Sequence, residues 1–173
     1  VQNDFYLTSG EATIRNLMIG TKIAKRFGNC AKTGYIPDQF GNISQLPQIF
    51  NQFGIDTCLL GRGYSFYTVG PGGRRKRRMT YPEFRWRGKD GSEVLSVRFT
   101  VWYNNAQRFS EDENKNVRLL DLIEKMYGGA CDMPYYLLMN GVDHLEPQEH
   151  LNDILRRTNR LIGDRGKLIQ CTM

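Results

Sequence analysis

Two short apolar runs on either side of a helical pattern constrain the fold of this chain more than any other feature. Residues 33–37 and 56–60 each have the length and apolar content of a strand, and residues 44–53 between them have the pattern of a short helix, which Gly54 closes. A crossover of this kind joins parallel strands and packs its helix on the sheet. The sequence therefore predicts an α/β fold with parallel strands.

The rest of the chain alternates between helices and strands in the same way. Hydrophobic periodicity, capping residues and turn signals predict helices over 9–27, 113–127 and 147–161, a hairpin with strands over 84–87 and 94–101, and a strand over 135–139. The glycine- and arginine-rich residues 70–80 are predicted to form a loop. Because strands alternate with helices, the pattern suits part of a (β/α) barrel.

Length and composition limit the class of protein. The chain has 173 residues, of which 40% are hydrophobic and 24% charged, and this composition excludes a disordered tail, a collagen-like repeat and a coiled coil. Its longest apolar run, residues 133–139, is too short to span a membrane. The chain begins with Val1 in what resembles the middle of a strand, so we expect residues 1–173 to be part of one α/β domain that is truncated at both ends.

The positive charge is concentrated in one place. The net charge is +6, and the run that holds five positive charges is Arg74, Arg75, Lys76, Arg77 and Arg78. Such a run could bind a phosphate backbone, which leaves open a non-catalytic module that binds nucleic acid or another polyanion. A solvated loop is the simpler interpretation, because the run is confined to one segment and no nucleic-acid motif accompanies it.

The cysteines indicate the redox environment. The chain has four of them, widely spaced and without a C-x-x-C pair, at Cys30, Cys58, Cys131 and Cys171. This spacing is not that of a disulfide framework or of a structural zinc site. We therefore expect buried free thiols in a reducing, cytoplasmic compartment.

Charged residues follow three of the predicted strands, where parallel α/β folds collect their reactive groups. Asp38 follows the first strand, Arg62 follows the second, and Asp143 follows the strand predicted over 135–139. Two carboxylates that face one cleft are what glycoside hydrolysis needs, and Phe40 could offer a ring for a sugar to stack on. From spacing alone the alternative stays open that both aspartates only cap turns or helices.

Four segments of the chain, in the same order, resemble glycoside hydrolase family 38, the α-mannosidases. The nucleophile segment of that family is similar to residues 34–49 (GYIPDQFGNISQLPQI), and the helix before it is similar to residues 9–17 (SGEATIRNL). Residues 103–107 (YNNAQ) and 139–144 (MNGVDH) resemble segments of the bacterial branch of the family. The resemblance implies an internal segment of the N-terminal catalytic domain, with the (β/α) barrel fold of that domain.

The same resemblance implies a role for each polar residue at the predicted strand ends. Asp38 would be the catalytic nucleophile and a ligand of a bound zinc ion, and Asp143 would be the general acid/base. Phe40 would line the sugar site, and Arg62 would lie close to the nucleophile. Together these roles describe a zinc-dependent, retaining exo-α-mannosidase that hydrolyses α-mannosides of glycans in two steps.

The chain also departs from the family pattern. The family's zinc site takes His and Asp ligands from segments before and after this one, and neither His144 nor His150 stands at a ligand position. Asn42 stands where many members carry histidine. The resemblance thus implies that this segment supplies Asp38 as one of about four zinc ligands and is inactive alone. It also implies that the full-length protein can form a homo-oligomer.

Overall fold

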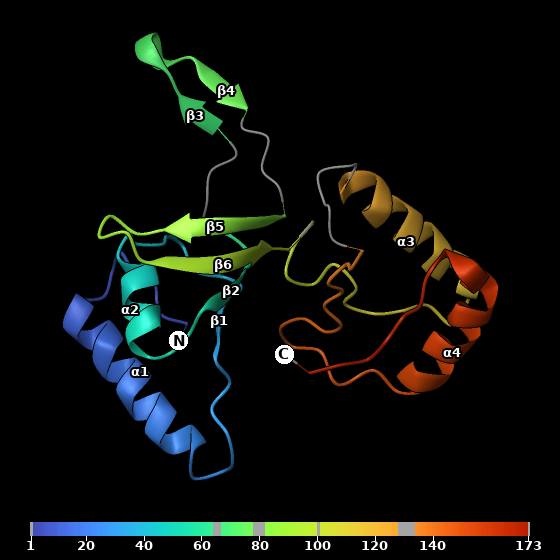
Figure 1. Cartoon of the computed structure of the whole chain (residues 1–173). Coiled ribbons are helices and arrows are strands. Elements are labelled where there is room, and N and C mark those ends of the chain that lie inside the picture. The colour runs from blue at the N-terminus through green and yellow to red at the C-terminus, as the bar shows by residue number, and fades with distance from the viewer. Residues whose placement is uncertain (1, 64–66, 78–81, 100, 128–133, 173) are drawn as a thin grey trace. The chain divides into compact units, whose positions relative to one another are not determined.

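The structure, a computed structural model, describes residues 2–63, 67–77, 82–99, 101–127 and 134–172. The chain divides into two compact units, Val1–Phe99 and Thr100–Met173. Each unit has its own helices (Figure 1). Each also has its own cluster of buried side chains. Within the described residues, no helix is both long enough and apolar enough to cross a membrane.

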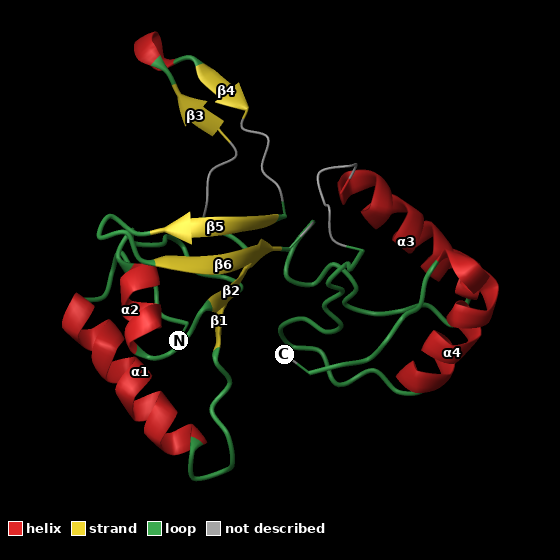
Figure 2. Ribbon diagram, in the orientation of Figure 1, coloured by secondary structure: helices red, strands yellow, loops and turns green. Residues whose placement is uncertain are grey.

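A four-stranded mixed sheet forms the centre of the first unit. Its strands are β1 (Thr33–Ile36), β2 (Thr57–Leu60), β5 (Glu83–Arg87) and β6 (Glu93–Arg98), in the order β1-β2-β6-β5. β1 pairs with β2, and β2 with β6, in parallel, whereas β5 and β6 form an antiparallel hairpin. Helix α2 (Leu46–Gln52) connects β1 to β2 and packs on the sheet (Figure 2). The predicted strand–helix–strand unit, the hairpin and the α/β class are confirmed, although β6 ends at Arg98 and not at the predicted residue 101.

Helix α1 (Gly10–Ala24) precedes the sheet and begins where the sequence predicts. The Ser9 hydroxyl accepts a hydrogen bond from the Ala12 N–H at 3.1 Å, which is the typical bond of an N-cap serine. The helix ends before the predicted Phe27. The N–H groups of Arg26 and Phe27 bond to carbonyls three residues back, and this tightens the chain into turns.

The core of the first unit lies between α2 and the sheet. Its most deeply buried side chains come from both elements and include Ile36, Leu46, Phe50, Cys58 and Val94. Phe50 packs against Gly34 of β1, where an added Cβ would approach the phenyl ring to 2.8 Å. The glycine therefore allows α2 to lie close to β1.

The cysteines match the expected buried thiols only in part. Burial raises the pKa of Cys58 to about 12, so this thiol stays protonated at neutral pH and packs as a small apolar group. Cys30 is half-buried and Cys171 is exposed, and both are free. Cys131 lies outside the described residues.

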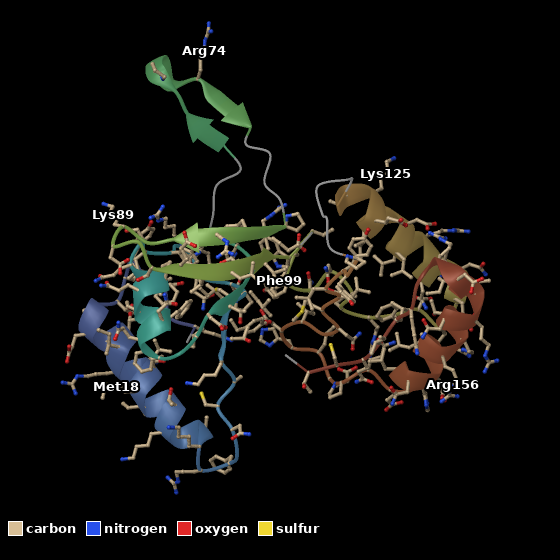
Figure 3. The ribbon with its side chains drawn as sticks, viewed as in Figure 1. Met18, Arg74, Lys89, Phe99, Lys125 and Arg156 are labelled. Atoms are coloured by element: carbon tan, nitrogen blue, oxygen red, sulfur yellow. The ribbon has the colours of Figure 1, made fainter. Side chains whose placement is uncertain are left out.

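The arginine run lies partly in a second, two-stranded sheet. β3 (Tyr67–Val69) and β4 (Arg75–Arg77) pair antiparallel, and a 3-10 turn at Pro71–Gly73 joins them. The loop predicted over 70–80 is therefore wrong for β4, because a Pro-Gly-Gly turn closes a hairpin when the residues on either side can pair. Arg74 is exposed and its side chain points away from the strands (Figure 3), and Arg78 lies outside the described residues.

Two helices, α3 (Glu113–Tyr127) and α4 (Leu151–Ile162), pack against each other in the second unit. α3 has the predicted bounds. α4 begins later than the predicted residue 147, because His150 before it has a left-handed φ of +56°. Ahead of α4, the Gln148 side chain donates a hydrogen bond to the Phe109 carbonyl at 2.6 Å.

The strand predicted over 135–139 is wrong. These residues have no regular structure. Backbone groups of Leu137 and Met139 bond to residues 105 and 106. The Asn105 amide donates to the Leu137 carbonyl at 2.9 Å and accepts from the Met139 N–H at 2.7 Å, and the Ala106 N–H donates to the Met139 carbonyl at 3.1 Å. An apolar run becomes a strand only where a neighbouring strand can pair with it, and here a side-chain amide takes that place.

Candidate active site

The loops that follow β1 and β2 leave the sheet at the same edge. The strands are parallel, Ile36 of β1 lies opposite Leu60 of β2, and the Gly61 N–H donates to the Ile36 carbonyl at 2.9 Å. A Cβ on Gly61 would overlap the Pro37 carbonyl oxygen. Only glycine therefore allows the two loops to approach this closely.

Arg62 binds Asp38 in two ways. Its Nη2 forms an ion pair with Asp38 Oδ1, and its Nε donates to the Asp38 main-chain carbonyl at 2.9 Å. Bonds from a charged donor are stronger than neutral ones, so this pair orients the carboxylate. The Asp38 side chain is still 43% exposed, which leaves the carboxylate accessible to a ligand. The arginine expected near Asp38 lies directly against it.

Phe40 adds an exposed apolar ring to this pair. The Arg62 guanidinium carbon lies 4.0 Å from the centroid of the ring, in a cation–π contact. The ring is 72% exposed. The Phe40 N–H donates to Asp4 Oδ1 at 3.0 Å, which fixes the backbone that carries the ring. The structure thus brings together three of the site residues that the sequence predicts, Asp38, Phe40 and Arg62.

Asn42, to which the sequence assigned no role, joins the two loops. Its Nδ2 donates to the Gly63 carbonyl at 3.0 Å and to the Arg62 carbonyl at 3.3 Å. Gly63 has a φ of +83°, a left-handed conformation that favours glycine. The Gly-Arg-Gly sequence indicates a tight loop, but no local pattern connects it to an amide 20 residues earlier.

Asp143 lies in the second unit, and because the strand over 135–139 is absent it does not follow a strand end as predicted. Its side chain is exposed, and its Oδ2 accepts a hydrogen bond from the Tyr103 hydroxyl at 3.2 Å. The Tyr103 ring stacks at a tilt on Trp102, with the ring centroids 5.4 Å apart. Sequence reasoning missed Tyr103 as a partner, because the two residues are 40 positions apart.

The described residues contain no group of three His, Cys, Asp or Glu side chains that could hold a metal ion. His144 and His150 are exposed and lie in left-handed backbone conformations. The accessible Asp38 carboxylate fits one ligand position of a zinc ion, but zinc sites take about three or four protein ligands. The described part of the chain therefore does not form a zinc site by itself.

Residues 1–168 match the sequence profile of the Glycosyl hydrolases family 38 N-terminal domain. A putative mannosylglycerate hydrolase from Halalkalibacterium halodurans is 31% identical over 95% of the chain, which corresponds to 18% of that protein. An alpha-mannosidase from Saccharomyces cerevisiae is 33% identical over 56% of the chain and 8% of its own length.

A solved structure is also similar to this chain. The crystal structure of an alpha-mannosidase from Enterococcus faecalis V583 superposes with a TM-score of 0.77 and 26% identity. The match covers 92% of the chain and 17% of the E. faecalis chain. The chain thus spans less than a fifth of the length of these proteins.

Replacing Gly61 with alanine should force the two loops apart. The added methyl group meets a backbone carbonyl, which cannot turn aside as a flexible side chain would, so we expect a loss of about 1–3 kcal/mol in the free energy of unfolding. Gly20→Ala is the matched control, because nothing lies within 4 Å of its Cβ in α1, and it should stabilise the protein by up to about 1 kcal/mol. Urea denaturation measures both changes, and a G61A protein as stable as the wild type would contradict the close approach.

Proposed function

The chain belongs to glycosyl hydrolase family 38, and on that premise we propose that it is the part of a retaining exo-α-mannosidase that carries the nucleophile. The observation that carries the proposal is the cluster beyond the sheet edge, where Arg62 holds the accessible carboxylate of Asp38 beside the exposed ring of Phe40. A positioned carboxylate next to a surface that can bind a sugar is what a glycosidase requires. The substrates are α-mannosides of glycans.

Asp38 is the nucleophile. One of its carboxylate oxygens attacks the anomeric carbon of the terminal mannose, so that a covalent ester forms while the bond to the leaving oxygen breaks. Arg62 supports this step because it fixes both the carboxylate and the main chain of Asp38 before substrate binds. Water then attacks the same carbon and releases Asp38, and the two inversions retain the configuration of the sugar.

Asp143 is the general acid and then the general base. It gives its proton to the leaving oxygen in the first step and takes a proton from the attacking water in the second. The hydrogen bond from the Tyr103 hydroxyl supports this role, because it orients the carboxyl group. The two carboxyl groups of a retaining glycosidase lie about 5 Å apart.

Phe40 and Arg62 bind the sugar. The phenyl ring is exposed on one side and held by the guanidinium on the other, so its free face can take the carbon-bound face of a mannose ring. The cation–π contact keeps the ring in place without burying it.

One comparison favours a second substrate. The putative mannosylglycerate hydrolase matches 95% of the chain, whereas the yeast alpha-mannosidase matches 56%. Hydrolysis of mannosylglycerate, an anionic mannoside, is therefore the second candidate function. The ratio of kcat/KM for mannosylglycerate to that for an aryl α-mannoside, measured on the full-length protein, decides between the two.

Zinc is the cofactor that we propose. Asp38 would supply one ligand through its accessible carboxylate. The described residues form no group that could complete the site, so the other ligands would lie outside them. The bound ion would supply a template that holds the sugar hydroxyls.

Asp38→Asn in the full-length protein should abolish turnover of aryl α-mannosides, because an amide does not form the ester intermediate. We expect kcat to fall by at least about 10³-fold with the fold retained. Asp164→Asn removes the same kind of charge from an exposed residue and should keep the wild-type kcat. A D38N protein with wild-type activity would refute the assignment of the nucleophile. So would proton NMR of the wild-type reaction if the mannose first released were the β-anomer.

Asp143→Asn should lower the rate of hydrolysis most for substrates whose leaving oxygen has to be protonated. Turnover of methyl α-mannoside, whose leaving group is poor, should fall by about 10²- to 10⁴-fold, since this is the range that a general acid contributes. Formation of the covalent intermediate from 2,4-dinitrophenyl α-mannoside, whose leaving group needs no proton, should change little in a pre-steady-state burst. Equal losses on both substrates would contradict the role of Asp143.

Removal of zinc from the full-length protein with dipicolinate should abolish hydrolysis, and added zinc should restore it. The metal content offers a readout that does not depend on activity. Asp38→Asn should lower the zinc bound per chain, measured by atomic emission after dialysis, whereas Asp164→Asn should leave it unchanged. A D38N protein that keeps its full zinc content would show that Asp38 is not a ligand.

A further inference from the structure

We propose that Asn42 is a positioning residue, whose amide holds the backbone of Arg62 so that the guanidinium stays against Asp38. The amide group donates from Nδ2 to the carbonyls of both Arg62 and Gly63, at 3.3 Å and 3.0 Å. It thus ties the loop after β1, which carries the carboxylate, to the loop after β2, which carries the guanidinium. The catalytic consequence rests on the proposed function of Asp38.

The loop that carries Arg62 is built so that its backbone lies close to neighbours on both sides of the arginine. A Cβ on Gly61 would overlap the Pro37 carbonyl oxygen, and a Cβ on Gly63 would overlap Asn42 Nδ2. Glycine avoids the steric clash that a Cβ would cause at these two positions. It also gives the loop more backbone conformations to sample when the loop is unfolded or partly open. Hydrogen bonds must therefore fix the loop, and the Asn42 amide provides them on the Gly63 side.

Fixing the backbone of Arg62 matters because its side chain is long. On a loop with an unfixed backbone, the arginine would lose backbone entropy as well as rotamer entropy when it pairs with one carboxylate, and its guanidinium would sample other positions. In the structure the same guanidinium meets three features at once: the Asp38 carboxylate, the Asp38 carbonyl and the Phe40 ring. A small shift of the backbone at Arg62 would break this combined geometry.

Asn42 acts on the site through Arg62 and not by touching the reacting groups. Both hydrogen bonds that its Nδ2 donates go to main-chain carbonyls of the Gly61–Gly63 loop. A role of this kind makes a specific kinetic prediction. The effect of losing Asn42 should disappear once the Arg62 side chain has been removed, because two residues that act through one contact are not additive.

The test is a double-mutant cycle in the full-length protein with an aryl α-mannoside as substrate. Asn42→Ala should lower kcat by about 5- to 30-fold, which corresponds to the loss of one or two neutral hydrogen bonds. In the Arg62→Ala background, Asn42→Ala should change kcat by less than about twofold. Asn42→Asp keeps the size of the side chain but, once ionised, donates no hydrogen bond, so it should lose at least as much activity as N42A.

Asn159→Ala is the matched control. Asn159 also holds the main chain with its amide, since it donates to the Leu168 carbonyl at 2.9 Å and accepts from the Leu168 N–H at 2.7 Å. It takes no part in the proposed chemistry, so its loss should leave kcat within about twofold of the wild type. The proposal is overturned if N42D keeps full activity, or if the effects of N42A and R62A multiply.

A crystal structure of the full-length N42A protein gives a readout that does not need activity. We expect the Arg62 guanidinium to leave Asp38 Oδ1 or to occupy more than one position. An unchanged ion pair in that structure would overturn the positioning role. If the wild-type protein hydrolyses no α-mannoside, the proposed function fails, and the crystal structure still decides what Asn42 does.

Discussion

The parallel pairing of β1 and β2 is the constraint on which the candidate site depends. Because Ile36 lies opposite Leu60, the loops that follow the two strands start side by side, and the Gly61 N–H joins them through the Ile36 carbonyl. This spacing leaves no room for a Cβ at Gly61. A shift of the register by one residue would turn each following side chain to the other face and separate the arginine from the carboxylate.

The site itself is organised around one guanidinium. Arg62 pairs with the Asp38 carboxylate, bonds to the Asp38 main chain and lies on the Phe40 ring, and it does so from a loop whose backbone is held by Asn42. The carboxylate is thereby fixed without being buried, which suits the role of nucleophile that we propose for Asp38. The other carboxylate that the sequence singles out, Asp143, lies in the second unit. It accepts a hydrogen bond there from the Tyr103 hydroxyl.

Elements whose signals are local agree best between sequence and structure. The apolar periodicity of α3 predicts both of its ends, and the Ser9 cap predicts the start of α1. The two clear errors are at residues 75–77 and 135–139. A strand needs a partner, and the sequence near each segment does not say whether one is present: β4 finds β3, whereas residues 135–139 meet the Asn105 amide instead.

The sequence by itself determined the order of α1, β1, α2, β2, β5 and β6 in the first unit, because periodicity and turn residues act over a few positions. It did not determine the hairpin of β3 and β4. It also singled out Asp38, Phe40 and Arg62 by motif and by the ends of β1 and β2. It singled out Asp143 by motif alone, because the strand predicted before Asp143 is absent. Only the tertiary structure decided what each of these side chains contacts. The bonds of Asn42 to the Arg62 loop and of Tyr103 to Asp143 join residues 20 to 40 positions apart, and a hydrogen bond over that separation depends on how the backbone between them folds.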